Sequence, residues 1–162
     1  MKRANLVDRI RTTRREFEAL LEGLSPRQMT QPGVAGEWSV KDMLAHIAWY
    51  EREEADFYGE IDVEGSPLWR LPQEPRNQKL FEQARHRPLQ EVLADFREAH
   101  ERLLSVVERL SEEDLATPGR FLGTSPEWPP WRRIAVHSCD HDREHIDMIQ
   151  AWLRSRHDGM PA

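Results

Sequence analysis

Hydrophobic residues recur every three or four positions along most of this chain, with charged residues between them. Four long stretches keep this spacing, namely residues 5–24, 40–58, 88–110 and 131–156. Apolar side chains at this spacing gather on one face of an α-helix, whereas a half-buried strand alternates in steps of two. The pattern therefore predicts an all-α protein, a four-helix bundle in which each helix buries one apolar face.

Serines mark several of the predicted helix starts. Ser25, Ser39 and Ser111 are each followed three residues later by glutamine or aspartate. In such a capping box the two side chains satisfy backbone N–H groups that the first turn of a helix leaves free. Ser39 therefore predicts the start of the second long helix, and the other two serines predict short helical turns after the first and third long helices.

Two stretches rich in glycine and proline, residues 61–75 and 117–130, interrupt the helical pattern. At about fifteen residues the first is longer than an ordinary connection, which makes it a candidate lid or pocket wall. Residues 77–86 then predict a short helix before the third long one. We therefore expect a long connection between the second and third long helices.

Length and composition limit the classes of protein to which the chain can belong. Its 162 residues fit one domain, residues 1–162, and no apolar run reaches transmembrane length. No secretory signal is recognisable, and the single cysteine, Cys139, fits a reducing compartment. We therefore expect a cytoplasmic protein with no membrane partner. The net charge of −6 argues against a nucleic-acid partner, because phosphate binding requires a clustered basic face.

Three histidines, His137, His141 and His145, recur at four-residue intervals in the last predicted helix. On a continuous helix they form a ladder along the face that also carries apolar residues such as Ile134 and Met148. An uncharged imidazole on a buried face serves to bind a metal, accept a hydrogen bond or move a proton. Since catalytic metal sites commonly use three protein ligands and one open position, the ladder predicts a metal site.

His46 is the best candidate for the third ligand, because it lies beside the apolar stripe of the second long helix. Spacing alone leaves open whether His137 and His141 or His141 and His145 complete the site. Cys139 is rejected as a ligand, because at about 100° per residue it points roughly 160° away from His141. The competing interpretation is a set of ordinary histidines, some exposed and some hydrogen-bonded in the core.

Residues around these histidines are candidates for catalytic roles. Asp42, one turn before His46, is a candidate to orient that imidazole, although a helix-capping role explains it equally well. Tyr50, one turn after His46, could offer its hydroxyl to a ligand, with core packing as the alternative. His137 is a further candidate to handle protons or orient a ligand.

Tryptophans and arginines add candidates for ligand binding. Four tryptophans are expected to wall a pocket at the end of the bundle, with plugging of the bundle end or a dimer contact as the alternative: Trp38, Trp69, Trp128 and Trp131. Five arginines are candidates to contact an anionic substrate or thiol, with simple solvation as the alternative: Arg76, Arg85, Arg120, Arg132 and Arg133.

Three segments resemble the DinB-like four-helix bundles, most closely the branch labelled ClbS/DfsB. They are GEWSVKDMLAHIAWYE at residues 36–51, RPLQEVLADFREAHERLLSVVERLSEEDL at residues 87–115 and HSCDHDREHIDMIQAWL at residues 137–153. The more specific parts are the W-S-V-K-D-M-L-A-H motif, which ends at His46, and the H-x-x-x-H pair with the I-x-x-W-L that follows it. The resemblance extends over nearly the whole chain.

The resemblance implies an up-down-down-up bundle with a long connection between the second and third helices, and a homodimer. It also implies a divalent metal, zinc or nickel, held by one histidine of the second helix and two of the fourth. The matching motifs assign these ligands to His46, His141 and His145. His137 then lies one turn outside the triad, as a residue that supports the triad or lines the pocket.

The resemblance leaves several functions open. Relatives include transferases that use bacillithiol or mycothiol, a maleylpyruvate isomerase, and ClbS, a self-resistance protein that hydrolyses a cyclopropane. We expect first a metal-dependent hydrolase or thiol-dependent transferase that activates water or a low-molecular-weight thiol against a small electrophilic substrate. The alternatives are a ClbS-like protein that binds a small molecule without a catalytic metal, and a non-catalytic dimer whose metal has a fourth protein ligand such as Glu54.

Overall fold

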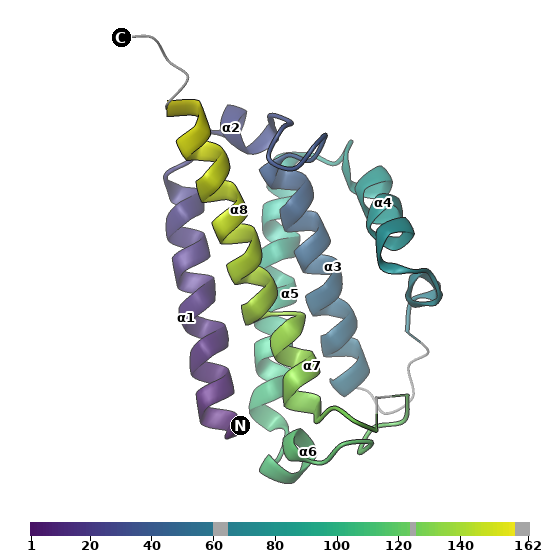
Figure 1. Cartoon of the computed structure of the whole chain (residues 1–162). Coiled ribbons are helices and arrows are strands. Elements are labelled where there is room, and N and C mark those ends of the chain that lie inside the picture. Colours follow the sequence, from purple (N-terminus) through teal and green to yellow (C-terminus); the bar gives the residue numbers. More distant parts are fainter. Residues whose placement is uncertain (60–64, 124–125, 158–162) are drawn as a thin grey trace.

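Four long helices pack side by side and form the body of the protein: α1 (Arg3–Glu22), α3 (Val40–Gly59), α5 (Leu89–Arg109) and α8 (Cys139–His157). The structure is a computed structural model that describes residues 1–59, 65–123 and 126–157. In Figure 1, α1 and α8 run upward beside each other, and α3 and α5 run downward. The described residues contain no strand beyond an isolated bridge between Ala35 and Trp38, so the all-α prediction is confirmed.

Shorter helices connect the long ones: α2 (Pro26–Thr30), the 3-10 helix η1 (Pro67–Arg70), α4 (Gln73–Ala84), α6 (Glu112–Ala116) and α7 (Pro130–Val136). The capping boxes predicted at Ser25 and Ser111 are both present and start α2 and α6. On the outer side of α3, α4 carries the chain back to the end of the bundle where α5 begins (Figure 1). None of the described helices combines the length and the apolar character that crossing a bilayer requires.

The predicted loop at residues 61–75 is partly helical. Its end contains η1 and the first turn of α4, while residues 60–64 lie outside the described residues. The prediction was wrong at Pro67 and Pro75, which lie in helical turns. Proline has no backbone N–H, but it is tolerated in the first turn of a helix, where a backbone N–H would make no intrahelical hydrogen bond. Ser66 supports the start of η1 by accepting a hydrogen bond from Leu68 N at 3.3 Å.

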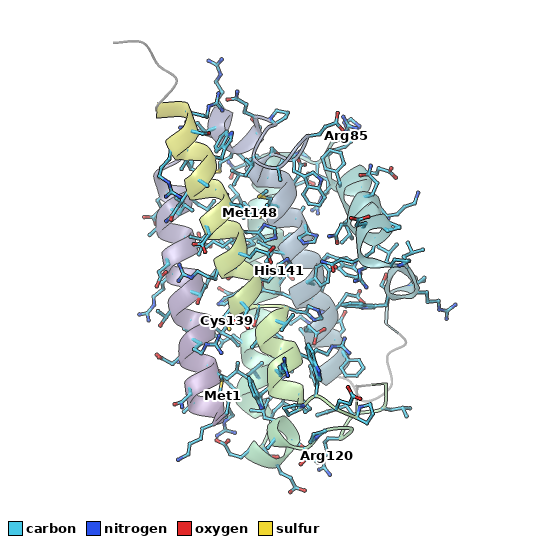
Figure 2. The ribbon with its side chains drawn as sticks, in the orientation of Figure 1. Met1, Arg85, Arg120, Cys139, His141 and Met148 are labelled. Atoms are coloured by element: carbon cyan, nitrogen blue, oxygen red, sulfur yellow. The ribbon has the colours of Figure 1, made fainter. Side chains whose placement is uncertain are left out.

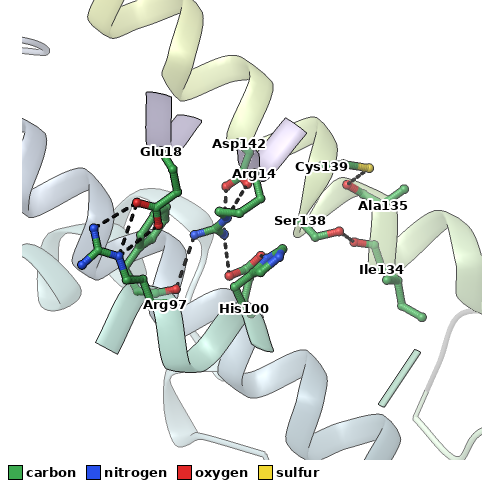
Figure 3. A network of polar contacts seen from close by, with 11 residues as sticks. Arg14, Glu18, Arg97, His100, Ile134, Ala135, Ser138, Cys139 and Asp142 are labelled. Carbon is green, nitrogen blue, oxygen red and sulfur yellow. Dashed lines mark hydrogen bonds and ion pairs between the residues drawn. The ribbon is translucent and has the colours of Figure 1, made fainter. Parts of the chain in front are cut away.

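The last predicted helix is divided in two, so the expectation of one continuous helix was wrong. Between α7 and α8, His137 has φ −96° and ψ 6°, outside the helical region. The Ser138 hydroxyl donates a hydrogen bond to Ile134 O at 2.6 Å (Figure 3). The backbone N–H of Ser138 donates to Ala135 O at 3.3 Å. Serine can compete in this way with the backbone ladder and bend a helix. His137 is therefore not the first step of a regular ladder.

The buried residues form two apolar clusters, one at each end of the bundle. The upper core includes Phe17, Met43 and Ile146, and the lower core includes Leu6 and Leu103. In α1, α3 and α8 the two cores are separated by about two turns, and in α5 by about one turn. A buried polar layer occupies that interval.

The polar layer contains one residue from each long helix: Arg14, Glu51, His100 and Asp142. Arg14 Nη2 donates to Glu51 Oε2 at 2.7 Å, and Arg14 Nε lies 3.1 Å from Asp142 Oδ2 (Figure 3). His100 Nδ1 lies 3.4 Å from Glu51 Oε1. The layer therefore joins the four long helices through buried polar contacts, and removing one partner of its ion pairs would leave an uncompensated charge.

Candidate metal centre

Three histidines from two helices converge on one point near the middle of the bundle. His46 belongs to α3, and His141 and His145 lie one turn apart on α8. Nε2 of His141 is 2.9 Å from Nε2 of His46 and 3.0 Å from Nε2 of His145. Figure 2 shows His141 at this height, above Cys139 and below Met148. Of the two pairs that spacing left open, the structure brings His141 and His145 together with His46.

Burial keeps the three imidazoles uncharged. Burial, followed by the charges of His145 and Arg76, lowers the pKa of His46 to about 3. Burial lowers the pKa of His145 to about 4, and together with the neighbouring histidines it lowers the pKa of His141 well below the usual value. Each ring is therefore neutral at pH 7 and has one nitrogen lone pair to offer, as a metal ligand requires.

Hydrogen bonds alone do not account for the contacts within this cluster. A nitrogen of neutral imidazole carries either one proton or one lone pair, so Nε2 of His141 makes one good hydrogen bond. Of its two neighbours, His46 Nε2 and His145 Nε2, one therefore lies at hydrogen-bond distance without forming a good hydrogen bond. A shared cation would resolve this conflict, because all three lone pairs would face it.

The two nitrogen separations around His141 also suit a divalent ion. Zinc binds imidazole nitrogen at about 2.0–2.1 Å, and a tetrahedral arrangement then separates the nitrogens by roughly 3.3 Å. The separations of 2.9 and 3.0 Å around His141 are close to this value, and all three ligand atoms lie within 4.8 Å of one another. Among the described residues, no further histidine, cysteine, aspartate or glutamate joins the group.

A cavity of about 400 Å³ opens beside the three histidines. Its wall comes from α3, α4, α7 and α8, and it includes Trp38, Tyr50, Arg76, Asn77, His137 and Glu144. The Trp38 ring meets His46 edge-on, with centroids 5.4 Å apart, and Tyr50 contacts both His46 and His141. Since Nδ1 of all three histidines is buried without a hydrogen-bond partner, these aromatic contacts orient the rings.

Asp42 caps a helix and does not contact His46. Asp42 Oδ2 accepts hydrogen bonds from the backbone N–H of Ser39 at 2.9 Å and from its hydroxyl at 2.6 Å. His46 Nδ1, the atom that Asp42 was a candidate to orient, has no partner. Of the two roles considered for Asp42, the structure therefore gives it the capping role at the start of α3.

Glu54 and Arg133 hold His137, which lies at the break between α7 and α8. His137 Nδ1 is 2.9 Å from Glu54 Oε1, and Arg133 Nη2 is 2.8 Å from the same oxygen. Burial favours the neutral form of Glu54, but the contacts with His137 and Arg133 outweigh it and lower the pKa of the carboxyl. Glu54 therefore stays ionised and favours the tautomer in which His137 Nδ1–H donates a hydrogen bond to it; in that tautomer Nε2 carries the lone pair.

A second cavity of about 590 Å³ lies on the other side of His137, which lines both. Its wall contains four aromatic side chains, Phe57, Tyr58, Trp69 and Trp128, together with charged residues such as Glu53 and Arg133. Of the four tryptophans expected to wall a pocket, Trp38 lines the first cavity, and Trp69 and Trp128 line the second. Trp131 lines neither and packs against the lower core.

Trp69 and Arg76, both candidates for ligand binding from the sequence, lie next to the histidines. The Trp69 ring lies 5.5 Å from that of His137, and Arg76 lies 4.6 Å above the Trp69 ring. Trp69 lies in η1 and Arg76 in α4, both within the connection whose helices the sequence pattern obscured. The sequence offered both residues as candidates by their chemistry and did not show that they lie together beside His137.

The comparisons with solved structures agree on the fold. A protein from Streptococcus pneumoniae superposes with a TM-score of 0.80 and 14% identity, over 95% of this chain and 91% of that one. DfsB, described as a sibling lethal factor precursor, superposes with a TM-score of 0.78 and 19% sequence identity over 99% of both chains. The colibactin self-resistance protein ClbS, crystallised with double-stranded DNA, superposes with a TM-score of 0.76 and 15% sequence identity, over 92% of this chain and 93% of that one. At these identities the likeness shows the fold alone.

The family follows from the sequence itself. No relative was found among the curated proteins. The family model of the DinB superfamily matches residues 9–149, which include all three converging histidines. The resemblance to the ClbS/DfsB branch is confirmed at the level of the fold by two of the structural neighbours. Since the match covers most of its length, this chain belongs to the DinB superfamily.

Proposed function

We propose that the protein is a metal-dependent enzyme in which His46, His141 and His145 hold one divalent ion, zinc or nickel. The observation that carries the proposal is the convergence of three neutral imidazoles on one point beside an open cavity. A divalent ion with an open coordination position supplies Lewis acidity, which lowers the pKa of a water or thiol that it binds. The substrate would be a small electrophilic molecule that reaches the ion through the cavity.

The absence of a fourth protein ligand among the described residues favours catalysis over a purely structural role. Structural zinc sites are usually closed by four protein ligands, and catalytic ones keep a position for water or substrate. Glu54, the fourth ligand considered from the sequence, is fully buried and bound to Arg133 and His137. It is therefore engaged elsewhere.

The His137–Glu54 pair is suited to take up a proton from a nucleophile in the cavity. Glu54 can accept a hydrogen bond from His137 Nδ1–H, which favours the tautomer whose Nε2 is free to accept a proton. A carboxylate that orients an imidazole in this way also stabilises the imidazolium that forms. Tyr50 is less suited to this task, because burial raises its pKa and its hydroxyl already donates to Asn77 Oδ1 at 3.1 Å.

The second cavity provides room for an apolar or aromatic part of the substrate. Its volume of about 590 Å³ and the four aromatic side chains in its wall are typical of small-molecule sites. Because His137 lines both cavities, a ligand bound in the second would lie next to the histidine cluster. A homodimer and the lack of a nucleic-acid partner remain predictions for this chain.

The test begins with elemental analysis of protein purified without an affinity tag. We expect about one equivalent of zinc or nickel in the wild type and its loss in His141→Ala, since three histidine ligands make one site. The control is His86→Ala, which removes an exposed histidine outside the cluster and retains the metal.

Activity is then measured on the metal-loaded protein with a chromogenic electrophile, in water alone and with 2-mercaptoethanol. Turnover that disappears in His141→Ala supports the enzyme. Consumption of one electrophile per protein without further turnover would point instead to sequestration of a small molecule. If neither zinc nor nickel binds to the wild type in a titration, the metal-dependent function is wrong.

A further inference from the structure

Arg76 is a cation in the wall of the histidine cavity, and no carboxylate of the described residues is paired with it. The one acidic residue of that wall is Glu144, an exposed side chain on α8 that forms no ion pair with Arg76. The protein as a whole has a net charge of −6. An uncompensated positive charge at this position is therefore a local feature of the cavity.

The other four arginines considered from the sequence are engaged outside the cavity of the three converging histidines. Arg120 pairs with Asp114 and Arg133 with Glu54. The guanidinium groups of Arg85 and Arg132 lie over aromatic rings, 5.2 and 4.1 Å from the ring centroids of Phe81 and Trp128. Of these five arginines, Arg76 alone lines the cavity that contains His46, His141 and His145.

The guanidinium of Arg76 is held in place on one side. Arg76 Nε donates to the Tyr50 hydroxyl at 3.0 Å, and that hydroxyl donates to Asn77 Oδ1 at 3.1 Å. The Arg76 guanidinium also lies 4.6 Å above the Trp69 ring. Because the described residues use only Nε for hydrogen bonding, the two terminal nitrogens keep their donors for a ligand.

We infer that Arg76 binds a carboxylate of the molecule that occupies the histidine cavity, and so selects anionic ligands. The inference rests on the proposed function for the identity of the reacting molecule, but the anion site itself does not need the metal. A planar guanidinium matches a carboxylate with two parallel hydrogen bonds, and a fixed guanidinium loses less freedom on binding. The carboxylate belongs either to the electrophilic substrate or to a thiol that reacts with it.

The anion site is tested by calorimetric titration of metal-free and zinc-loaded protein with benzoate and with its neutral counterpart, benzamide. We expect wild type to bind benzoate about tenfold or more tightly than benzamide in both forms, because an ionised partner strengthens the hydrogen bonds. Arg76→Met removes the preference and keeps an aliphatic stem against Trp69. The matched control Arg85→Met, on an exposed arginine at the end of the same helix, retains the preference.

Two outcomes would overturn the inference: a wild type that binds benzoate no more tightly than benzamide, or a benzoate preference that survives in folded Arg76→Met. The wild-type comparison decides the matter even if the variant does not fold. Metal content, measured on the same samples, reports separately on the histidine site. A protein that binds no metal but prefers benzoate through Arg76 would refute the proposed function and retain the anion site.

A second arm distinguishes the sources of the carboxylate. Zinc-loaded protein is titrated with 3-mercaptopropionate and with 2-mercaptoethanol, a thiol without a carboxylate. A preference for 3-mercaptopropionate that Arg76→Met abolishes assigns the carboxylate to the thiol. Benzoate binding that is undiminished in saturating 2-mercaptoethanol assigns it to the electrophile.

Discussion

Replacing His145 with glutamine is expected to make the metal-free protein less sensitive to acid. His145 is 7% exposed, and burial lowers its pKa from 6.5 to about 4. As the pH falls below 6.5, histidine in the unfolded chain takes up a proton that the folded protein does not accept until about pH 4. The unfolded state therefore binds more protons in this range, and the free energy of unfolding decreases as the pH falls.

The magnitude follows from the two pKa values. Between pH 7.5 and pH 5 the contribution of His145 to the free energy of unfolding decreases by about 2 kcal/mol. Asp142 acts in the opposite direction, because burial raises its pKa and the folded protein gains a proton there on acidification. The wild-type profile mixes these effects, so the informative quantity is the difference between wild type and His145→Gln. Glutamine does not titrate, and the variant lacks the contribution of His145.

The assay is urea unfolding in the presence of a chelator at several pH values from 8 to 5. Relative to wild type, His145→Gln is expected to gain about 2 kcal/mol between pH 7.5 and pH 5, whatever its stability at pH 7.5. The control His86→Gln replaces an exposed histidine outside the cluster and is expected to follow the wild-type profile. A difference between wild type and His145→Gln that stays constant within about 0.5 kcal/mol over this range would refute the reasoning.

Three further predictions concern the polar layer, the histidine cavity and the cysteine. Arg14→Met leaves Glu51 and Asp142 buried without their cation and is expected to lower the free energy of unfolding, measured in urea, by about 3 kcal/mol. The control Arg143→Met removes an exposed ion pair with Glu16 and is expected to lower it by less than about 1 kcal/mol. Equal losses in the two variants would contradict this prediction. Adding Ni²⁺ is expected to quench tryptophan fluorescence less in Trp38→Phe than in wild type, because the Trp38 ring lies 5.4 Å from that of His46. Cys139 is 3% exposed and burial raises its pKa, so a disulfide reagent is expected to label it slowly in native protein and rapidly in denaturant; fast native labelling would show that the lower core opens readily.

The parts of the fold that depend on local chemistry were predictable from the sequence. The apolar spacing marks all four long helices, and the capping boxes of Ser25 and Ser111 mark the starts of α2 and α6. His141 and His145 could be grouped because four residues make about one turn of a regular helix. The addition of His46 depended on its place beside the apolar stripe of another helix, and the structure brings its Nε2 to within 2.9 Å of His141 Nε2.

The parts that depend on contacts between distant residues were not predictable. Spacing placed His137 on the same ladder, but the helix breaks where the Ser138 hydroxyl bonds to Ile134 O. Nothing in the sequence pairs Glu54 with His137, because the two residues lie 83 positions apart. In the same way, Arg76 has no special spacing, and only the return of α4 along the outer side of α3 brings it into the cavity wall.

The polar layer and the candidate metal centre are linked through the rotation of α8. Asp142 follows His141 directly, and on a helix successive residues point about 100° apart. Asp142 is therefore directed toward Arg14 while His141 is directed toward His46 and the cavity. A rotation of α8 that moved His141 away from His46 would also pull Asp142 from Arg14 and leave buried charges unpaired. The buried ion pair thus restrains the helix that carries two of the three histidines, although it contacts none of them.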